Sequence, residues 1–488
     1  MSSTAIFWCD RDFRICDNPA LACASSEFDT CVCVYIHDSL PLEGVTLGAG
    51  AASNWWLHHS LISFSSQLRD LGIPLIIRQG STLEGLLKLV KESKADAVFW
   101  NRRYEPELVK RDSYIKQALR EFGVRADSFH GNLLIEPWKI LNKSKKPFRV
   151  FTPFWNALKS DYVAPEPKRV TPHETSAISL DSLRIEDLGL LPTIKWDYAF
   201  YKEWEPGEPN AIKALRAFLL NSSKDYDRDR DIPSIRASSR LSPALHFGEI
   251  SVHDLWREVK AHIDTSDTRT HDALWSYLRQ IAWREFAANL LFHNPSTPSQ
   301  PLRSEFSSFP WRPDADFLSL WQKGQTGIPL VDAGMRELWQ TGWMHNRVRM
   351  VAASFLVKQL LQPWQDGAKW FWDTLLDADL ANNSLGWQWV AGCGADAAPY
   401  FRIFNPILQG EKFDPNGTYV RTWVPELSAM PNKWIHRPWQ APTQILVSAS
   451  ITLGTTYPRP CMDPDEGRTR ALMAYDKMKK LTEKNFSR

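Results

Sequence analysis

The chain lacks the long apolar runs and the leader that would place it in or across a membrane. No run of 18 apolar residues occurs among its 488 residues, so we expect no membrane span. The first residues, MSSTAIFWCD, show no basic region followed by a long apolar stretch. We therefore expect no signal peptide and a cytoplasmic protein.

The chain also lacks a metal-binding cysteine pattern and a strong charge of one sign. Five of its seven cysteines lie in the first 33 residues, but none forms a Cys-x-x-Cys motif with a matching second pair. That spacing excludes a typical zinc site, and we expect no metal. The formal net charge is only +2. A nucleic-acid partner would therefore have to be attracted by a local basic patch.

What the chain does have is alternation of strand and helix patterns in its first part. Short apolar, β-rich runs alternate with amphipathic stretches such as residues 54–72, which predicts a parallel sheet with helices on both faces. No Gly-x-Gly-x-x-Gly follows the first run and no Walker loop occurs, so an ordinary dinucleotide site loses its main support. The predicted strands are residues 5–8, 31–36, 73–78 and 97–100.

The pattern changes twice along the chain. Residues 131–205, which include NKSKKPFRVFTPFW, are rich in Pro, Lys and Ser and indicate a long surface linker. Helical periodicity then dominates, and a basic helix ends the chain. We predict a doubly wound α/β domain over residues 1–130, a linker over 131–205 and a larger all-helical domain over 206–488.

Several polar motifs could bind a ligand, and each has a simpler structural interpretation. SSRLS, residues 238–242, is either an anion site at a helix start or a plain N-cap, which is the commoner case. Helical spacing in WMHNRVRM places Trp343, Asn346, Arg347 and Met350 on one face. That face suits a flat polar ligand or a partly buried helix.

Two further motifs leave the same kind of choice. LRQIAWREF puts Gln280, Trp283 and Arg284 at i, i+3, i+4, which indicates an aromatic platform for a base or a packed indole. LLDADLANN carries Asp377 and Asp379, for which ribose hydroxyls or a helix cap are better partners than a metal.

The order of these motifs resembles the photolyase/cryptochrome family over nearly the whole chain. RDFRICDNPAL resembles the family's N-terminal signature. SSRLSPALHFGEIS, WREF, TGWMHNRVRM and LANNSLGWQWVAGCGADAAPYFRIFNP resemble its flavin domain, in order and spacing. The resemblance implies an α/β antenna domain, a long linker and an all-helical domain that holds a U-shaped FAD.

The resemblance also implies roles for individual residues. Asn383 matches the position opposite flavin N5, and Trp387, Trp364 and Trp311 match an electron-transfer path to the surface. The implied FAD contacts are Tyr226, Ser238, Ser239, Arg240, Leu241, Ser242, Arg284, Asn346, Arg349, Asp377, Asp379 and Asn383. The implied lesion contacts in DNA are Arg230, Gln280, Trp283, Arg347, Met350 and Trp389.

Departures from the family pattern refine the expected chemistry. Asn383 stands where plant cryptochromes have Asp, and a neutral amide favours repair over storage of a protonated radical. Asn346 and Met350 stand where photolyases for 6-4 photoproducts usually have His. Gln280 replaces a Glu found in many relatives. No folate-contacting Asn-Glu pair is apparent, so the antenna pigment is open: methenyltetrahydrofolate, a deazaflavin, a flavin or none.

We therefore expect a monomeric, light-driven enzyme that repairs cyclobutane pyrimidine dimers in ultraviolet-damaged DNA with reduced FAD. The first alternative is a cryptochrome-type blue-light sensor, which the chain's end soon after the basic helix disfavours. The second is an aromatic-rich helical module that binds single-stranded nucleic acid without chemistry.

Overall fold

The computed structural model describes residues 3–38, 49–173, 180–397, 399–400 and 402–486. Residues 174–179 of the predicted linker, and Ala398 and Phe401 of the last motif, lie outside the described residues. The chain forms two compact units. The first unit consists of Met1–Lys224, Ser239–Pro295 and Leu376–Asp379, and the second consists of Asp225–Ser238, Ser296–Leu375 and Leu380–Arg488. The domain boundaries near residues 130 and 205 stay predictions.

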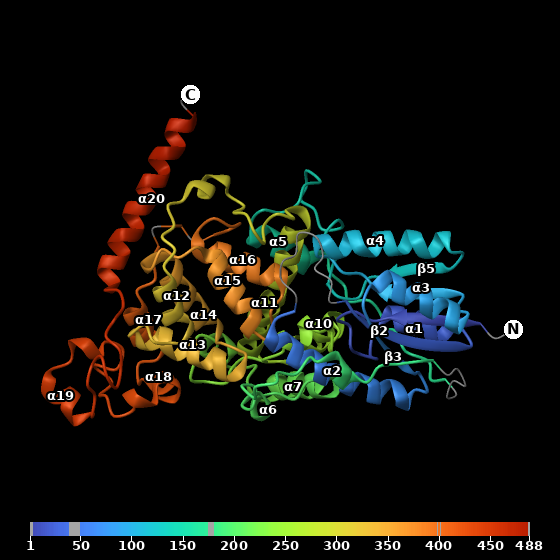
Figure 1. The fold of residues 1–488 in the computed structure, drawn as a ribbon, viewed down its shortest axis with the longest axis horizontal. Coiled ribbons are helices and arrows are strands. Elements are labelled where there is room, and N and C mark those ends of the chain that lie inside the picture. The colour runs from blue at the N-terminus through green and yellow to red at the C-terminus, as the bar shows by residue number, and fades with distance from the viewer. Residues whose placement is uncertain (1–2, 39–48, 174–179, 398, 401, 487–488) are drawn as a thin grey trace. The chain divides into compact units, whose positions relative to one another are not determined.

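A five-stranded parallel sheet forms the centre of the first unit (Figure 1). Its order is β3-β2-β1-β4-β5, so the strand order reverses between β1 and β4. The predicted doubly wound fold is confirmed. The strands are β1 (Thr4–Trp8), β2 (Thr30–His37), β3 (Leu75–Gln79), β4 (Ala97–Asn101) and β5 (Arg125–Phe129).

The helices of the first unit pack on this sheet or follow it along the chain. They are α1 (Pro19–Glu27), α2 (Ala51–Asp70), α3 (Thr82–Ser93), α4 (Pro106–Glu121), α5 (Phe151–Asp161), α6 (Phe200–Glu203), α7 (Glu208–Asn221), α9 (Ser242–His246), α10 (Val252–Thr265) and α11 (Thr268–His293).

The second unit is helical, as predicted. Its helices are α8 (Tyr226–Asp229), α12 (Ala315–Gln322), α13 (Pro329–Thr341), α14 (Asn346–Ser354), α15 (Trp364–Thr374), α16 (Leu380–Ala391), α17 (Pro406–Phe413), α18 (Thr418–Trp423), α19 (Thr443–Ser448) and α20 (Pro464–Phe486). A π-helical stretch, Phe355–Gln359, follows α14. Among the described residues, no helix has the length and apolar character needed to cross a bilayer.

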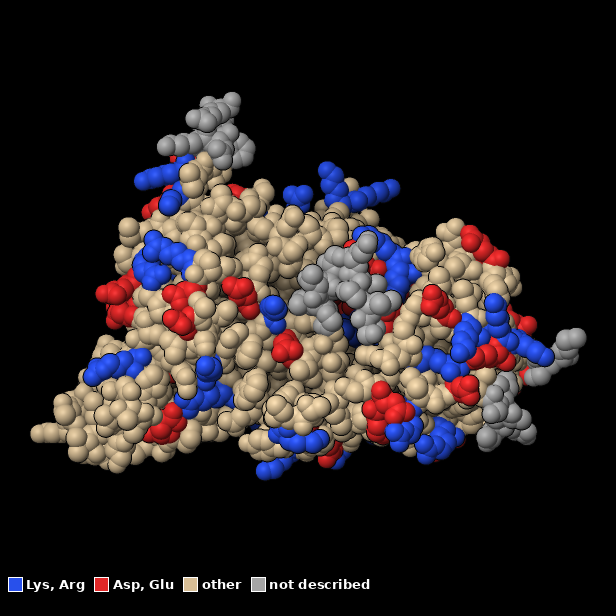
Figure 2. Space-filling view, in the orientation of Figure 1, with Lys and Arg blue, Asp and Glu red and all other residues tan. Residues whose placement is uncertain are grey.

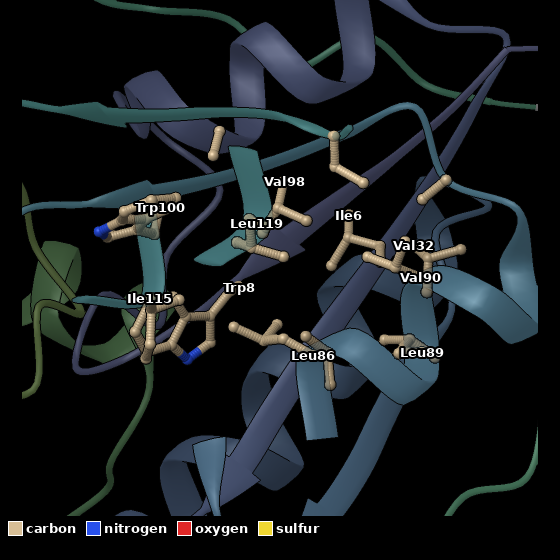
Figure 3. Packing of buried hydrophobic residues seen from close by; sticks show 14 of the residues in the cluster. Ile6, Trp8, Val32, Leu86, Leu89, Val90, Val98, Trp100, Ile115 and Leu119 are labelled. Atoms are coloured by element: carbon tan, nitrogen blue, oxygen red, sulfur yellow. The ribbon is translucent and has the colours of Figure 1, made fainter. Parts of the chain in front are cut away.

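Alternation along the strands places two apolar layers on the two faces of the sheet. Ile6 and Trp8 of β1 lie with Leu86 of α3 and Leu119 of α4 in one buried cluster (Figure 3). Phe7, one residue away, faces the opposite layer, because successive strand residues alternate. At about 25 cal/mol per Å² of buried apolar area, these layers supply the main stabilisation of the sheet. The apolar layers cover the two faces of the sheet, so polar side chains can gather at the carboxyl ends of the strands.

Candidate active site

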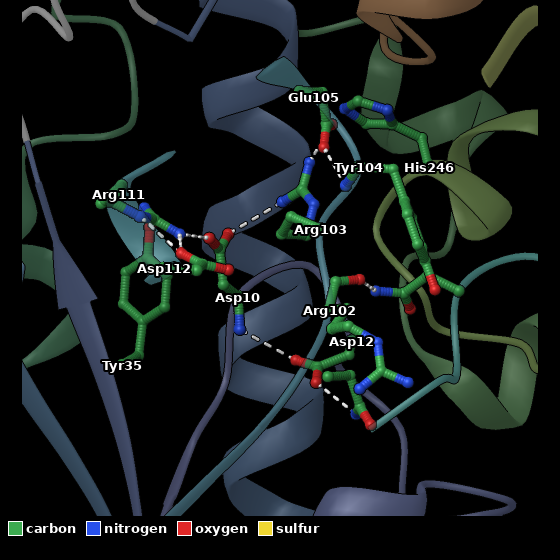
Figure 4. A network of polar contacts seen from close by, with 12 residues as sticks. Asp10, Asp12, Tyr35, Arg102, Arg103, Tyr104, Glu105, Arg111, Asp112 and His246 are labelled. Carbon is green, nitrogen blue, oxygen red and sulfur yellow. Dashed lines mark hydrogen bonds and ion pairs between the residues drawn. The ribbon is translucent and has the colours of Figure 1, made fainter. Parts of the chain in front are cut away.

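Charged side chains occupy the carboxyl edge of the sheet in the first unit, where the strand order reverses. Open α/β sheets usually bind ligands at such a point. Figure 4 shows Asp10, which follows β1, between Arg103 (3.0 Å) and Arg111 (2.7 Å). Burial alone would raise the pKa of Asp10, but these two guanidinium groups outweigh it and hold the pKa well below its usual range. A ligand at this edge would therefore meet paired charges of both signs.

The segment from Ser239 to Ser242 enters α9 without a serine cap. The N-cap residue is Leu241, whose side chain has no hydroxyl. The Ser239 hydroxyl instead accepts a hydrogen bond from the Tyr277 hydroxyl at 3.0 Å. Arg240 has a left-handed φ of 54°, a costly conformation for a residue with a Cβ. The prediction of a plain N-cap is therefore wrong. Ser238 lies just before this segment, in the second unit.

The Arg240 guanidinium is already engaged within the first unit. It pairs with Glu203 at 3.0 Å and lies 4.1 Å from the centre of the Trp204 ring. Its charge is thus largely compensated, so it would contribute shape and hydrogen bonds to a ligand more than net attraction.

Helix α11 places Gln280, Trp283 and Arg284 along one stripe, as their spacing predicts. The Trp283 ring stacks on Phe151 with centroids 3.7 Å apart and planes 7° apart. Trp283 stays partly exposed, so the indole is both packed and accessible. Gln280 Nε2 donates to the Ser276 carbonyl at 3.2 Å, which leaves the acceptor capacity of its Oε1 unused by that bond.

Arg284 joins α11 to the start of the predicted linker. Its guanidinium pairs with Glu285 at 2.8 Å and donates to the Asn132 carbonyl at 2.8 Å. Glu285 in turn accepts a hydrogen bond from the Leu134 amide at 2.6 Å. Burial raises the pKa of Glu285 to about 7, although Arg284 opposes the shift. Arg284 therefore has a structural partner besides the predicted ligand.

The two acidic residues before α16 belong to the first unit. Asp379 Oδ2 lies 3.8 Å from His246 Nδ1. Burial and the nearby Arg11 lower the pKa of His246 to about 4, so this His is neutral at pH 7. The contact is then not an ion pair. Asp377 is partly buried two residues earlier.

Helix α14 in the second unit begins later than its sequence pattern suggests. Its first residue is Asn346, and the His345 ring caps it by accepting the Arg347 amide at 3.2 Å. Gly342 ends α13 with a left-handed φ of 67°, so Trp343 lies in the connecting turn. The predicted helical face is therefore wrong for Trp343.

The remaining residues of that face do lie on one helix. Asn346 Nδ2 lies 3.9 Å from Met350 Sδ, one turn away. Arg347 pairs with Asp231 at 2.7 Å and lies 4.4 Å from the centre of the Phe413 ring. These contacts orient the Arg347 guanidinium.

Two other predicted contacts of the second unit also have partners inside it. Arg349 Nε donates to the Met344 carbonyl at 2.7 Å. The Arg230 guanidinium lies 5.3 Å from the centre of the Tyr226 ring. Tyr226 is only 5% exposed, so any ligand contact it makes would come from inside the fold.

Helix α16 carries Asn383, Trp387 and Trp389. Asn383 Nδ2 donates to the Ala368 carbonyl of α15 at 3.0 Å. Trp387 is 2% exposed and packs edge-on against Phe371, with centroids 5.0 Å apart. Trp389 is only partly buried. The two indoles therefore occupy different environments, as their i, i+2 spacing predicts.

The other two tryptophans of the predicted electron-transfer path lie on adjoining segments of the second unit. Trp364 begins α15 and is 2% exposed, whereas Trp311 is partly exposed. The Arg312 amide donates to the Leu361 carbonyl at 2.8 Å, which holds the segment after Trp311 beside the segment before Trp364. Burial thus decreases from Trp387 and Trp364 to Trp311.

Sequence reasoning missed the partners of these residues. Phe151 and Asp231 contact the predicted residues Trp283 and Arg347, yet they lie far from them in sequence. The only signal for Phe151 was its place in the apolar end of NKSKKPFRVFTPFW.

Comparison with known proteins found two matching families and similar full-length chains. Residues 5–173 match the family described as DNA photolyase, and residues 277–477 match the FAD binding domain of DNA photolyase. The chain is 44% identical over 491 residues to a deoxyribodipyrimidine photo-lyase of Agrobacterium fabrum, covering 99% of both chains. It is 39% identical to Cryptochrome-1 of Arabidopsis thaliana, covering 98% of this chain and 71% of that protein.

A solved structure is similar over the same length. The crystal structure of a bacterial class III photolyase from Agrobacterium tumefaciens superposes with a TM-score of 0.94 at 43% identity, covering 98% of each chain.

Proposed function

Because the chain belongs to the DNA photolyase and cryptochrome family, we propose that it is a light-driven repair enzyme. Its substrate is a cyclobutane pyrimidine dimer in ultraviolet-damaged DNA, and its activity is that of a deoxyribodipyrimidine photo-lyase. We also propose that the protein is a monomer and that it acts on DNA in the cytoplasm. The antenna pigment stays open: methenyltetrahydrofolate, a deazaflavin, a flavin or none.

The observation that carries the proposal is the fixed amide of Asn383. Its bond to the Ala368 carbonyl uses one N–H and none of the acceptor capacity of Oδ1. The Oδ1 atom can therefore accept the N5–H of a reduced flavin, while the neutral amide offers no mobile proton. A carboxyl group at this position would supply one.

The chain's own residues fit the FAD that its second family match implies. When bound, reduced FAD supplies the photoexcited electron that opens the dimer. Hydroxyls, two amides and both signs of charge suit its phosphates, ribose and ring. The proposed contacts are Tyr226, Ser238, Ser239, Arg240, Leu241, Ser242, Arg284, Asn346, Arg349, Asp377, Asp379 and Asn383.

The tryptophans divide into two groups with different roles. Trp387, Trp364 and Trp311 would pass electrons inward from the surface, since Trp311 is partly exposed whereas Trp364 and Trp387 are each 2% exposed. Trp283 and Trp389 would pack against the flipped dimer. Stacking is worth about 1–3 kcal/mol per base, which can offset the few kcal/mol needed to extrude the lesion.

Polar lesion contacts complete the proposal. Arg230, Gln280, Arg347 and Met350 would line the dimer's other sides. Asp231 holds the Arg347 guanidinium before substrate arrives, which lowers the conformational cost of binding. The absence of His at positions 346 and 350 favours cyclobutane dimers over 6-4 photoproducts.

The test uses ultraviolet-irradiated oligothymidylate and FAD-loaded, reduced protein. Blue light should restore thymine absorbance, and a dark sample should not recover. Irradiated DNA that carries only 6-4 photoproducts serves as the substrate control. Recovery on that DNA alone would reassign the substrate, and no recovery above the dark sample would reject repair.

A cryptochrome-type blue-light photoreceptor is the second candidate, favoured by the 39% identity to Arabidopsis Cryptochrome-1. It predicts light-driven reduction of bound flavin without dimer splitting. Thymine recovery in the same experiment separates the two functions, and a parallel sample that starts with oxidised flavin shows whether light reduces the flavin.

A further inference from the structure

One short segment of the first unit, beside Trp283, carries basic residues and no acidic ones. Between Glu136 and Asp161 the sequence has six Lys or Arg residues and no Asp or Glu. The whole chain has 58 basic and 56 acidic residues, so the rest of it carries an excess of acids. We propose that the loop of Lys143, Lys145, Lys146 and Arg149, named here the basic arm, binds the phosphates of the DNA strand that flanks the lesion.

The basic arm is an ordered turn. The Asn142 side chain accepts the amides of Ser144 (2.9 Å) and Lys146 (3.1 Å), and the Asn142 amide donates to the Lys146 carbonyl (2.8 Å). Lys145 has a left-handed φ of 56°. The turn therefore fixes where the lysines emerge, and less conformational entropy is lost when they bind a ligand.

The four cations of the basic arm are exposed and have no carboxylate partner within the part of the chain that the structure describes. By contrast, Lys139, just before the arm, pairs with Glu136 at 2.7 Å. In the view of Figure 2, Lys and Arg side chains project together at the edge of the molecule where Figure 1 places α5. An unneutralised cluster of this kind fits a polyanion.

The position of the arm is set by Phe151, which begins α5 and stacks on Trp283 at 3.7 Å. A chain spans at most about 3.6 Å per residue, so Lys146 lies within about 18 Å of this stack and Arg149 within about 7 Å. Phosphates follow one strand at about 3.4 Å of rise. The arm can therefore reach phosphates within about five nucleotides of a base stacked on Trp283.

Two neighbouring cations extend the same surface. The Arg279 guanidinium lies 5.5 Å from the centre of the Phe151 ring, and Lys159 Nζ lies 4.0 Å from the centre of the Trp275 ring. Both come from α5 or α11, the helices that carry the stack. The arm thus supplies the local basic patch that a nearly neutral chain needs to attract DNA.

This inference rests on the proposed function, because it takes damaged DNA as the partner. The test replaces Lys143 and Lys146 with Gln and Lys145 with Asn, which tolerates a left-handed φ. The matched control changes Lys88 and Lys91 of α3 to Gln and Lys94, also left-handed at φ 55°, to Asn. Both variants lose three positive charges from the first unit.

The measurement is the affinity for fluorescently labelled duplex DNA, intact or ultraviolet-irradiated, over a range of salt concentrations. Each phosphate contact contributes about 0.9 to the slope of log K against log salt. The arm variant should lower that slope by about 2–3 and weaken both DNAs equally, and the control should keep the wild-type slope. An arm variant with the wild-type slope would overturn the inference.

Two further variants separate failure of the basic arm from failure of the proposed lesion site. Should the triple variant fail to fold, the double variant K143Q/K146Q leaves the left-handed position intact and should lower the slope by about 2. Trp283→Ala should instead abolish the preference for irradiated DNA and keep the slope. If W283A changes nothing while the arm variant changes the slope, the proposed lesion site fails and the arm stands.

Discussion

Gly367 of α15 is the position where a single methyl group should test the packing around Trp387. A Cβ placed on Gly367 would lie 2.5 Å from Cζ3 of Trp387 and 2.7 Å from Cδ2 of Leu356. Trp387 cannot easily retreat, because it is 2% exposed and also packs edge-on against Phe371 and Trp321. Overpacking of this kind costs about 1–3 kcal/mol.

Gly386 provides a matched control on the neighbouring helix. A Cβ there meets nothing within 4 Å, so Gly386→Ala should stabilise α16 by about 0.5–1 kcal/mol. Both variants gain the same helix propensity. The two free energies of unfolding should therefore differ by about 1–3 kcal/mol, with Gly367→Ala the less stable.

Urea titration followed by circular dichroism measures that difference, and near-ultraviolet circular dichroism reports the displaced indole. Gly367→Ala should also slow light-driven reduction of bound flavin, whereas Gly386→Ala should leave its rate unchanged. Equal stability of the two variants would refute the close packing of Gly367 on Trp387.

Three other changes test separate parts of the structure. Burial raises the pKa of Glu249 to about 8 from a usual 4.5, so its folded carboxyl binds a proton that the unfolded one has lost. The free energy of unfolding should therefore fall by about 1.4 kcal/mol per pH unit between about pH 4.5 and 8. Glu249→Gln should remove this pH dependence in urea titrations. An unchanged dependence of stability on pH contradicts the raised pKa of Glu249. Phe151→Leu removes the ring under Trp283 and should cost about 0.5–1.5 kcal/mol of preference for irradiated over intact DNA in anisotropy titrations; unchanged preference contradicts the stacking role. Asn383→Asp removes the amide that donates to the Ala368 carbonyl and should lower the free energy of unfolding, measured in urea, by about 1–3 kcal/mol. Because the new carboxyl group can carry a proton, the rate of light-driven flavin reduction should also become pH-dependent. A pH-independent rate contradicts the proposed role of the neutral amide.

The sheet was largely predictable because its strands are buried on both faces. Residues 5–8, 31–36, 73–78 and 97–100 are short apolar runs, and each falls within or overlaps a strand. The edge strand β5 (Arg125–Phe129) was missed, because RADSF is polar at three of five positions and one side of an edge strand needs no sheet partner.

The errors at helix ends have local causes. The helical pattern predicts one face from Trp343 to Met350, but Gly342 ends α13 and α14 begins only at Asn346. The cap of α9 was misassigned because hydroxyls before a proline usually signal an N-cap, whereas Ser239 is used by Tyr277, 38 residues away. Period and composition carry no information about such distant partners.

The sequence suggested candidate site residues but not the side chains that they contact. The order of motifs led to Asn383, Trp387 and Trp283, since each lies in a distinctive segment. Sequence alone could not place Phe151 against Trp283, 132 positions later along the chain. It also could not reveal that Arg347 is held by Asp231, because a charged residue in a helix pattern is usually solvated.

One turn of α15 positions both groups on which light-driven chemistry would depend. The Ala368 carbonyl accepts from Asn383, and the adjacent Gly367 allows Trp387 to approach. Asn383 and Trp387 are four residues apart, so they share a face of α16. Trp389 lies off that face and is partly exposed. The packing of Trp387 against α15 would serve a sensor and a repair enzyme alike, because both need a buried electron donor, whereas the Asn383 amide favours repair. The variants at Gly367 and Asn383 therefore test the light-driven step, whereas Trp283→Ala tests lesion binding separately.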